Sequence, residues 1–380
     1  MKLLTIIGAR PQIIKAAAVS RVLQQPQYNT IEETLLHTGQ HYDSNMSSVF
    51  FDELGIPAPH YNLGVGSNRH GEQTAQIISG IEDVLIREHF DGVLLYGDTN
   101  STLAGAVATA KLQIPIFHVE AGLRSFNMTM PEEQNRIVCD HLSSICFAPT
   151  KTAVENLANE GLCSSPALFE SGKQRRVVQS GDVMYDNCLF YVGLAALQCD
   201  ILTHYNLQIG QYILATIHRN YNTDNPLRFT ALFQSLLDIA ERHDIAVALP
   251  LHPRTAKMLR TNLESHVQRR LNKSDHILLL PPVSYLEMIE LERHALLVMT
   301  DSGGVQKEAF FFERPCIVLR PETEWVEIVQ EGAGIVADTN PDLINDAFNQ
   351  LADRRFHFPP LFGDGHAAEH IVNEIINYLS

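Results

Sequence analysis

Three acidic residues of this 380-residue chain, Asp98, Glu120 and Glu132, follow apolar runs that predict buried strands. They come from three separate strand-end loops. Several carboxylates that face one cleft raise each other's pKa, which suits them to act as acids and bases. Taken singly, each is more often a helix cap or a salt-bridge partner, and Glu132 directly follows Pro131, a residue favoured in a first helical turn. As a set, the three residues predict proton-transfer chemistry.

A glycine-containing turn, Asp301-Ser302-Gly303-Gly304, follows another apolar run and opens a helical pattern. Glycines let a phosphate approach the backbone, and a helix N-terminus offers unpaired amides and a positive dipole. An ordinary Ser N-cap explains the tetrapeptide about as well. Glu308, one helical turn further along, could reach a pair of ribose hydroxyls. His218, at the end of a different run, could donate to a diphosphate or could be a capping or core histidine.

Two cations, Arg10 and Lys15, flank the start of the first helical pattern. Positive charges are unfavourable beside the positive end of a helix dipole, so their position favours a bound phosphate or sugar over a solvated helix start. No dinucleotide-binding G-x-G-x-x-G and no P-loop follows any strand candidate. The pattern His366-x-x-Glu369-His370 resembles a zinc motif, but too few residues follow it to supply the further ligand that such a site needs.

Short apolar runs alternate with longer helical patterns along nearly the whole chain. This alternation predicts an α/β fold with parallel sheets that are covered on both faces. We expect strands at residues 3–7, 34–38, 92–96, 114–119, 145–148 and 177–179, and then at 212–217, 246–249, 276–280, 296–300, 316–319 and 334–337. The two sets predict two doubly wound, Rossmann-like domains facing a cleft. The first is expected to comprise residues 1–185 with a C-terminal helix at 366–380, and the second, which would bind the nucleotide, residues 186–365.

The composition excludes several classes of protein. The formal net charge is −16, a poor match to nucleic acid or to an anionic membrane surface. Hydrophobic residues make up 45% and charged residues 19%, which argues against disorder. The six cysteines have no zinc-like spacing and predict buried free thiols. No apolar run is long enough to span a membrane, and the first one is too short for a signal peptide, so we expect a cytoplasmic location.

Taken together, the motifs resemble the non-hydrolysing UDP-N-acetylglucosamine 2-epimerase family. The likeness runs in order from about residue 3 to residue 365. It is carried by Gly8-Ala9-Arg10-Pro11 with Lys15, Thr38-Gly39-Gln40-His41, Gly97-Asp98-Thr99, His118-Val119-Glu120-Ala121-Gly122-Leu123-Arg124, Pro131-Glu132-Glu133 with Asn135-Arg136, Gly181-Asp182-Val183, His218-Arg219, Thr300-Asp301-Ser302-Gly303-Gly304-Val305-Gln306 and Thr323-Glu324-Trp325.

The resemblance implies a GT-B-like pair of domains, a homodimer, a UDP-sugar substrate, and neither a nicotinamide nor a metal cofactor. It implies inversion of carbon 2 of the sugar, converting UDP-N-acetylglucosamine to UDP-N-acetylmannosamine and back, which would supply precursors of surface polysaccharides. UDP is eliminated to leave a 2-acetamidoglucal and is then added back. One carboxylate takes the proton from carbon 2, and another group returns a proton to the opposite face. Cations and amides stabilise the departing diphosphate.

The family's functional positions fall on particular residues of this chain. The resemblance assigns catalysis to Asp98, Glu120, Glu132 and His218. It assigns substrate binding to Arg10, Lys15, Ser302, Gly303, Gly304, Glu308 and Arg320, with the uracil held by the backbone of Val283 and by side-chain packing of Met288.

Departures from the family pattern leave the substrate and its regulation open. Tyr42-Asp43 stand where members that are activated by their own substrate tend to have Arg-Gln-like residues. The runs at 98–103 and 323–327 look closest to a subgroup that acts on UDP-2,3-diacetamido-2,3-dideoxyglucuronic acid. Hydrolysis ranks below epimerisation, because Arg10-Pro11-Gln12 replaces the motif usual in hydrolysing relatives. The remaining alternatives are a glycosyltransferase of the same architecture and a UDP-sugar sensor without catalytic activity.

Overall fold

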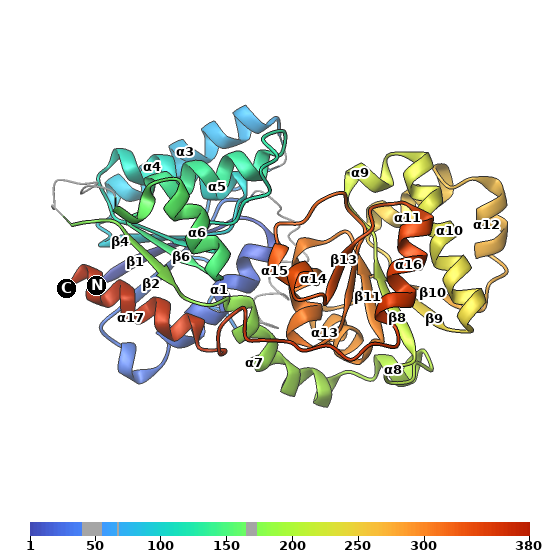
Figure 1. Cartoon of the computed structure of the whole chain (residues 1–380). Helices are drawn as coiled ribbons and strands as arrows, with labels where there is room; N and C mark the ends of the chain where they lie inside the picture. The colour runs from blue at the N-terminus through green and yellow to red at the C-terminus, as the bar shows by residue number, and fades with distance from the viewer. Residues whose placement is uncertain (40–54, 67, 165–172) are drawn as a thin grey trace. The chain divides into compact units, whose positions relative to one another are not determined.

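The computed structural model describes residues 1–39, 55–66, 68–164 and 173–380. The chain divides into two compact units (Figure 1). Unit 1 comprises Met1–Asn187 and Pro360–Ser380, and unit 2 comprises Cys188–Pro359. The sequence-based boundaries at 185 and 365 lie within a few residues of these limits. The motif residues from Gln40 to Asp43 lie outside the described part of the chain.

Unit 1 is built on a parallel sheet of seven strands in the order β3-β2-β1-β4-β5-β6-β7. The strands are β1 (Lys2–Ile7), β2 (Glu32–His37), β3 (Tyr61–Asn62), β4 (Gly92–Tyr96), β5 (Ile116–Val119), β6 (Ile145–Ala148) and β7 (Arg176–Gln179). The helices are α1 (Arg10–Leu23), α3 (His70–Arg87), α4 (Asn100–Lys111), α5 (Pro131–Leu142), α6 (Lys151–Asn159), α7 (Val183–Gln198), which continues into unit 2, and α17 (Ala367–Leu379).

Unit 2 repeats this plan with a parallel sheet of six strands in the order β10-β9-β8-β11-β12-β13. The strands are β8 (Tyr212–Thr216), β9 (Ala246–Pro250), β10 (Ile277–Leu280), β11 (Leu297–Thr300), β12 (Cys316–Val318) and β13 (Gly334–Val336). The helices are α8 (Ile201–His204), α9 (Asn220–Thr223), α10 (Pro226–His243), α11 (Pro253–Thr261), α12 (Ser265–Leu271), α13 (Tyr285–His294), α14 (Gly303–Phe311), α15 (Val326–Gln330) and α16 (Pro341–Leu351).

The predicted α/β class is confirmed, since both sheets have the strand order of doubly wound folds. All twelve expected strands are present, with ends that differ by at most two residues. The central strands are continuous apolar runs because helices cover both faces of a parallel sheet. The sequence reasoning missed β3, whose two residues are too few to give an apolar pattern. The expectation for the cysteines was partly wrong, because Cys163 is exposed.

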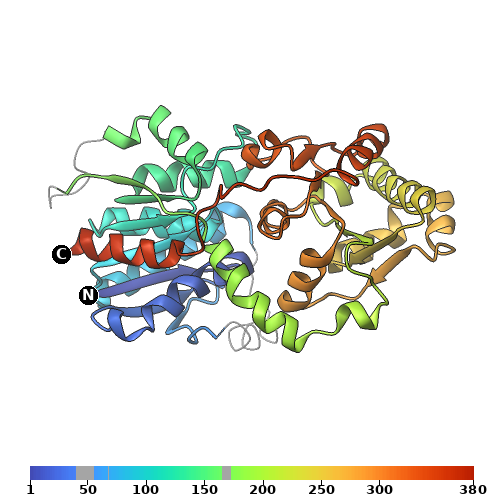
Figure 2. The same cartoon turned by 60° about the horizontal axis from the view of Figure 1, so that its bottom comes forward.

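The C-terminal helix α17 belongs to unit 1 and packs against α1. Both views show it beside the sheet of that unit, with the two chain ends close together (Figures 1 and 2). Its buried face is formed by Ala367, Ala368, Ile371, Val372, Ile375 and Tyr378. No helix in the described part of the chain is both long and apolar enough to cross a membrane.

We expect Ile371→Ala to lower the free energy of unfolding of unit 1 by about 2–5 kcal/mol, because the substitution leaves a cavity at a fully buried site. Asn373→Ala, on the exposed face of the same helix, is the matched control and should change it by less than about 0.5 kcal/mol. Urea denaturation monitored by circular dichroism measures both variants. Equal stability of the two would contradict the assignment of α17 to the core of unit 1.

Candidate active site

Each sheet has a switch point where the strand order reverses, between β1 and β4 in unit 1 and between β8 and β11 in unit 2. Open α/β sheets bind ligands beyond the carboxyl ends of the strands at this point. The turns that follow β1 and β4 carry Gly8 and Asp98, and those that follow β8 and β11 carry His218 and Ser302. The topology therefore places Asp98, His218 and Ser302 where this fold binds ligands.

In unit 1, Asp98 follows β4 and forms an ion pair with Arg136 of α5. The Arg136 Nη2 atom lies 2.5 Å from Asp98 Oδ2, and the Asp98 side chain is 29% exposed. Asn135, on the same helix, donates to the Asp98 carbonyl oxygen at 2.8 Å. One helical turn thus fixes both the backbone and the carboxylate of Asp98, while part of the carboxylate stays accessible.

Glu120 follows β5 and forms an ion pair with Lys15 of α1. Both side chains are largely buried, and an adjacent ammonium group stabilises the ionised form of a carboxylate. The backbone of Glu120 adopts φ = +69°, in the left-handed region. This conformation costs a non-glycine residue about 1–3 kcal/mol, and such strain is concentrated at functional sites. The pairing of Lys15 with Glu120 also explains why a cation is tolerated near the start of α1.

The Asp98 and Glu120 turns meet at Gly97, whose φ is +61°. A Cβ atom at Gly97 would lie 3.1 Å from Lys15 Nζ and 3.3 Å from Glu120 Oε2. The residue before Asp98 is therefore in close contact with the Lys15–Glu120 pair. Two carboxylates, each paired with a cation, are brought together at one end of the sheet.

The expectation of three separate strand-end loops was wrong for Glu132. This residue lies in the first turn of α5, within the same connection after β5 that begins at Glu120. Pro131 does occupy the first helical turn, as predicted. Among the described residues, no hydrogen-bond or ion-pair partner contacts the Glu132 carboxylate, so a role in a salt bridge has no support.

The turn after β1 is closely packed. A Cβ atom at Gly8 would lie 2.1 Å from Ser101 Oγ and 2.2 Å from Thr38 Oγ1, so only glycine fits there. The buried Gln12 side chain accepts from the amides of Gly8 and Ala9 at 2.9 and 3.1 Å. Arg10 is exposed at the first position of α1, beyond this fixed turn.

In unit 2, the fully buried Asp301 organises the end of β8. Its carboxylate accepts from the amides of His218 and Arg219 at 3.0–3.1 Å and from Asn222 Nδ2 at 3.1 Å. The His218 Nδ1 atom lies 3.4 Å from Asp301 Oδ1. Burial lowers the pKa of His218, although the Asp301 carboxylate opposes this effect. Asp301 thus fixes the loop and the ring of His218.

Helix α14 presents unpaired amides at its N-terminus. Ser302 occupies the N-cap position, but its side chain makes no capping hydrogen bond. Its own amide donates to Thr300 Oγ1 at 2.9 Å. The amides of Gly303 and Gly304 have no backbone or side-chain acceptor in the described part of the chain. The plain Ser-cap interpretation therefore fails, and the amides are available to an anion.

The other predicted binding residues of unit 2 lie within α14 or elsewhere in that unit. Arg320 forms an ion pair with Glu324 at 3.0 Å. A Cβ atom at Gly303 would lie 2.3 Å from Glu324 Oε1, so this ion pair packs directly against the N-terminus of α14. Glu308 is buried further along the helix. Val283 and Met288 are partly buried against the core of unit 2, just before and within α13.

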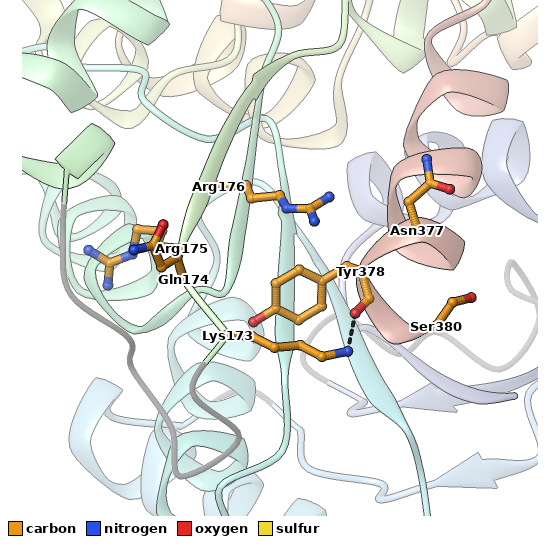
Figure 3. Close-up of a pocket in the computed structure, with 7 residues that line it drawn as sticks. All are labelled: Lys173, Gln174, Arg175, Arg176, Asn377, Tyr378 and Ser380. Atoms are coloured by element: carbon orange, nitrogen blue, oxygen red, sulfur yellow. Dashed lines mark hydrogen bonds between the residues drawn. The ribbon is translucent and has the colours of Figure 1, made fainter.

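A pocket elsewhere in unit 1 contains none of the predicted site residues. It is lined by Lys173, Gln174, Arg175, Arg176, Asn377, Tyr378 and Ser380. Figure 3 shows the Tyr378 ring between Lys173 and Arg176, with Lys173 donating to the Tyr378 carbonyl oxygen. Lys173 and Arg176 both contact Tyr378 at the end of α17. The pocket therefore lies where α17 packs beside β7.

Comparison with known proteins identifies the family. A family model described as UDP-N-acetylglucosamine 2-epimerase matches residues 24–376. The chain belongs to the UDP-N-acetylglucosamine 2-epimerase family. It is 46% identical over 373 residues to the UDP-2,3-diacetamido-2,3-dideoxy-D-glucuronate 2-epimerase of Pseudomonas aeruginosa, covering 98% of each chain. It is 39% identical to the UDP-N-acetylglucosamine 2-epimerase of Methanocaldococcus jannaschii over 100% of this chain and 99% of that protein.

A solved structure supports membership of the epimerase family. The crystal structure of the Methanocaldococcus jannaschii UDP-GlcNAc 2-epimerase, in complex with UDP-GlcNAc and UDP, matches with a TM-score of 0.87. The match covers 99% of this chain and 100% of that one. The two doubly wound units therefore have the GT-B-like fold that the family resemblance implies.

Sequence reasoning did not include several residues of this epimerase-family chain among its candidate site residues. Arg136 and Asp301 were noted only as parts of motifs, although they hold Asp98 and His218 directly. The spacing of four residues between Glu132 and Arg136 places both on one face of α5 and could have indicated Arg136. No sequence signal marks Glu324 as a neighbour of Gly303.

Proposed function

We propose that this protein is a non-hydrolysing epimerase that reversibly inverts carbon 2 of a UDP-N-acetylhexosamine, interconverting UDP-N-acetylglucosamine and UDP-N-acetylmannosamine. The observation that supports the proposal is a pair of cation-paired carboxylates in adjacent turns, with Glu120 lying beside Gly97, the residue directly before Asp98. A reaction that removes a proton from one face of a carbon and adds one to the other face needs at least two such groups.

The proposed chemistry proceeds through elimination. A carboxylate of unit 1 accepts the carbon 2 proton while the bond between carbon 1 and the diphosphate oxygen breaks, which leaves a 2-acetamidoglucal and UDP. A protonated group then returns a proton to carbon 2 from the opposite face as UDP re-adds to carbon 1. Asp98 and Glu120 are the proposed acid–base groups. Glu132 is a further candidate, since its carboxylate has no partner among the described residues.

Unit 2 is proposed to hold UDP. The unpaired amides of Gly303 and Gly304 are suited to the diphosphate, and negative charge grows there as UDP leaves. His218 and Arg320 would add hydrogen bonds to the same group, Glu308 would bind the ribose, and Val283 with Met288 would hold the uracil. Arg10 and Lys15 of unit 1 are the remaining proposed substrate-binding residues. No cofactor takes part in this proposal.

The sugar could instead be UDP-2,3-diacetamido-2,3-dideoxyglucuronic acid. The support is the 46% identity to the Pseudomonas aeruginosa protein of that name, together with the similar runs at 98–103 and 323–327. The chemistry at carbon 2 is the same for both sugars. They differ in the uronic carboxylate and in the group at carbon 3, so a direct comparison of turnover distinguishes them.

We expect the protein, given a UDP-sugar alone in deuterium oxide, to form the carbon 2 epimer with deuterium at carbon 2 and traces of free UDP. Proton NMR on both candidate UDP-sugars measures exchange and identifies the preferred substrate. Binding without deuterium incorporation would indicate a sensor, and a need for an acceptor would indicate a glycosyltransferase. Epimer formed without solvent deuterium would contradict exchange through these carboxylates.

Assembly and location stay predictions. We propose a homodimer in the cytoplasm, as the family resemblance implies, with no nucleic-acid or membrane partner. Sedimentation equilibrium of the purified protein tests the oligomeric state, and cell fractionation tests the location.

A further inference from the structure

Helix α5 carries three charged residues at intervals of four, Glu132, Arg136 and Asp140, so they follow one another along a single face. Arg136 holds Asp98. Asp140, one turn further on, is fully buried. The proposed chemistry leaves Asp140 without a role. A carboxylate in this position needs strong partners, because burying an unpaired charge is costly.

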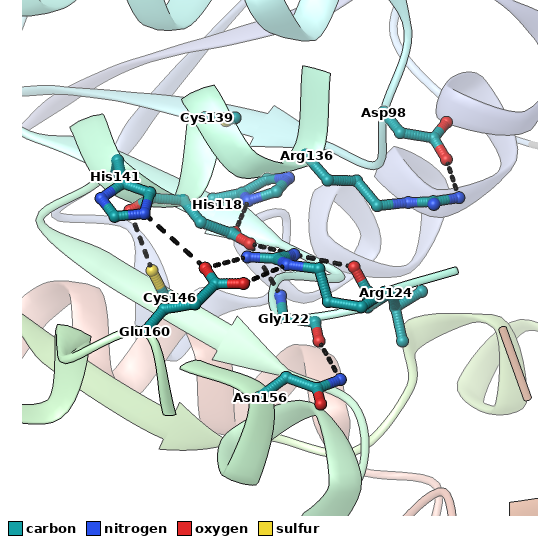
Figure 4. Close-up of polar contacts among 12 residues, drawn as sticks. Asp98, His118, Gly122, Arg124, Arg136, Cys139, His141, Cys146, Asn156 and Glu160 are labelled. Carbon is teal, nitrogen blue, oxygen red and sulfur yellow. Dashed lines mark hydrogen bonds and ion pairs between the residues drawn. The ribbon is translucent and has the colours of Figure 1, made fainter. Parts of the chain in front are cut away.

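The Asp140 carboxylate makes three contacts with described residues. Its Oδ1 atom lies 2.7 Å from His118 Nδ1. Its Oδ2 atom accepts from the Gly122 amide at 3.1 Å and lies 2.8 Å from Arg124 Nη1. Arg124 also forms an ion pair with Glu160, at 2.7 Å (Figure 4). Asp140 thus joins α5 to the end of β5 and to the turn that contains Glu120.

His118 links this carboxylate to the other catalytic turn. Its ring is fully buried, with Nδ1 facing Asp140 Oδ1 and Nε2 lying 2.8 Å from the Gly97 carbonyl oxygen. A carboxylate and a carbonyl oxygen are both acceptors, so both ring nitrogens must donate, and only the imidazolium form of histidine does so. The charges of His118 and Arg124 are balanced by those of Asp140 and Glu160.

The electrostatics agree with this geometry. Burial by itself lowers the pKa of His118, but the adjacent Cys139 and the Asp140 carboxylate outweigh burial, so the pKa of His118 is raised well above its usual value. The pKa of Asp140 is lowered, since His118 and Arg124 together outweigh its burial.

Asp140 and His118 each bind one backbone atom in the turns that carry Glu120 and Asp98. The Gly97 carbonyl forms the peptide bond that leads into Asp98, and the Gly122 amide lies two residues after Glu120. Glu120 has a positive φ angle, which is strained for a non-glycine residue, whereas Gly97 adopts its positive φ without strain. A strained residue such as Glu120 keeps its conformation only where surrounding contacts impose it.

We propose that Asp140 is a positioning residue that fixes the Asp98 and Glu120 turns together, through His118 on one side and the Gly122 amide on the other. The proposal rests on the proposed function, in which Asp98 and Glu120 transfer protons. Displacement of a reacting group by about 1 Å can cost about 10²-fold in rate, so loss of this anchor should slow the chemical step rather than weaken UDP binding.

The first test compares Asp140→Ala with Asp140→Asn. We expect Asp140→Ala to lower kcat about 10²-fold, with KM and the Kd for UDP within about threefold of wild type. We expect Asp140→Asn to stay within about tenfold of wild type. The Oδ1 atom of the introduced Asn can accept from the Gly122 amide, and its Nδ2 group can donate to the Nδ1 atom of a neutral His118. Such a histidine still donates to the Gly97 carbonyl oxygen through Nε2. Glu160→Gln is the control, since Glu160 contacts Arg124 but neither turn, and should keep kcat within about twofold.

The second test separates the two bonds of His118 and is informative even if Asp140→Ala fails to fold. The amide of Gln can replace the Nε2 donor to Gly97, whereas that of Asn can replace the Nδ1 donor to Asp140. We expect His118→Gln to have a kcat at least about tenfold higher than His118→Asn. ¹⁵N NMR of histidine-labelled wild-type protein, assigned by the loss of one residue's signals in His118→Gln, should show both His118 nitrogens protonated at neutral pH.

The outcomes separate this proposal from the proposed function. A wild-type protein without carbon 2 exchange would overturn the function. Normal wild-type exchange with unchanged kcat in folded Asp140→Ala, even at reduced thermal stability, would overturn the positioning role. So would an Asp140→Asn variant as slow as Asp140→Ala, or equal activity of His118→Gln and His118→Asn.

Discussion

Replacing Asp98 by Asn or Glu120 by Gln is expected to lower kcat by about 10²-fold or more, while UDP still binds. Each amide keeps the shape of the side chain but cannot take up a proton near neutral pH. The proposed UDP-binding residues lie in unit 2, so the Kd for UDP should change little. Steady-state epimerisation and isothermal titration with UDP measure the two quantities.

The control for this pair is Glu72→Gln, an exposed carboxylate in the first turn of α3, which should keep full activity. If Asp98 and Glu120 served only as ion-pair partners of Arg136 and Lys15, their amide variants would lose thermal stability and retain turnover. That result would show that Asp98 and Glu120 do not transfer protons in the reaction.

Glu132→Gln extends the series to the residue whose role is most open. As an acid–base group it should behave like Asp98. As a carboxylate that merely favours the first turn of α5, its replacement should cost only about 0.3–1 kcal/mol of stability and leave kcat unchanged. An active, less stable variant would leave Asp98 and Glu120 as the acid–base candidates.

The fold could be predicted from the sequence because its physical signal is local. Strands buried on both faces must be apolar throughout, so runs such as 92–96 and 145–148 stand out without any knowledge of their neighbours. Glycine and polar residues directly after the strands mark the end of the sheet where ligands bind. Strand β3 gave no such signal, since a two-residue strand depends on pairing with β2 rather than on its own pattern.

The site could be predicted only in part because its decisive contacts join distant residues. The Lys15–Glu120 pair spans 105 positions, and no local pattern connects its members. His118 lies in an otherwise apolar strand, where it could equally have been a core residue. Its partner Asp140 becomes interpretable only once α5 is seen to pack beside β5. The sequence shows which residues are charged, but only the fold shows which of them form ion pairs with one another.

Gly303→Val is expected to weaken UDP binding by about 10-fold or more while unit 2 remains folded. A Cβ atom at this position would lie 2.3 Å from Glu324 Oε1, so any side chain must displace Glu324 and disturb its ion pair with Arg320. The added methyl groups would also lie at the unpaired amides of α14, where the diphosphate is proposed to bind. Loss of a single charge-assisted hydrogen bond, at about 1.5–3 kcal/mol, already accounts for an effect of this size, since tenfold in Kd is about 1.4 kcal/mol.

Gly193→Val is the matched control, because a Cβ atom there meets nothing within 4 Å and the residue is exposed on α7. Valine is at least as favourable as glycine inside a helix, so this variant should fold normally and bind UDP like wild type. Isothermal titration with UDP compares the two, and circular dichroism confirms that each is folded. Because Asp301, His218 and the strands of unit 2 are untouched, weaker binding by folded Gly303→Val alone assigns the diphosphate to the N-terminus of α14. Equal affinity of the two variants would move the diphosphate away from this helix and leave its free amides without a ligand.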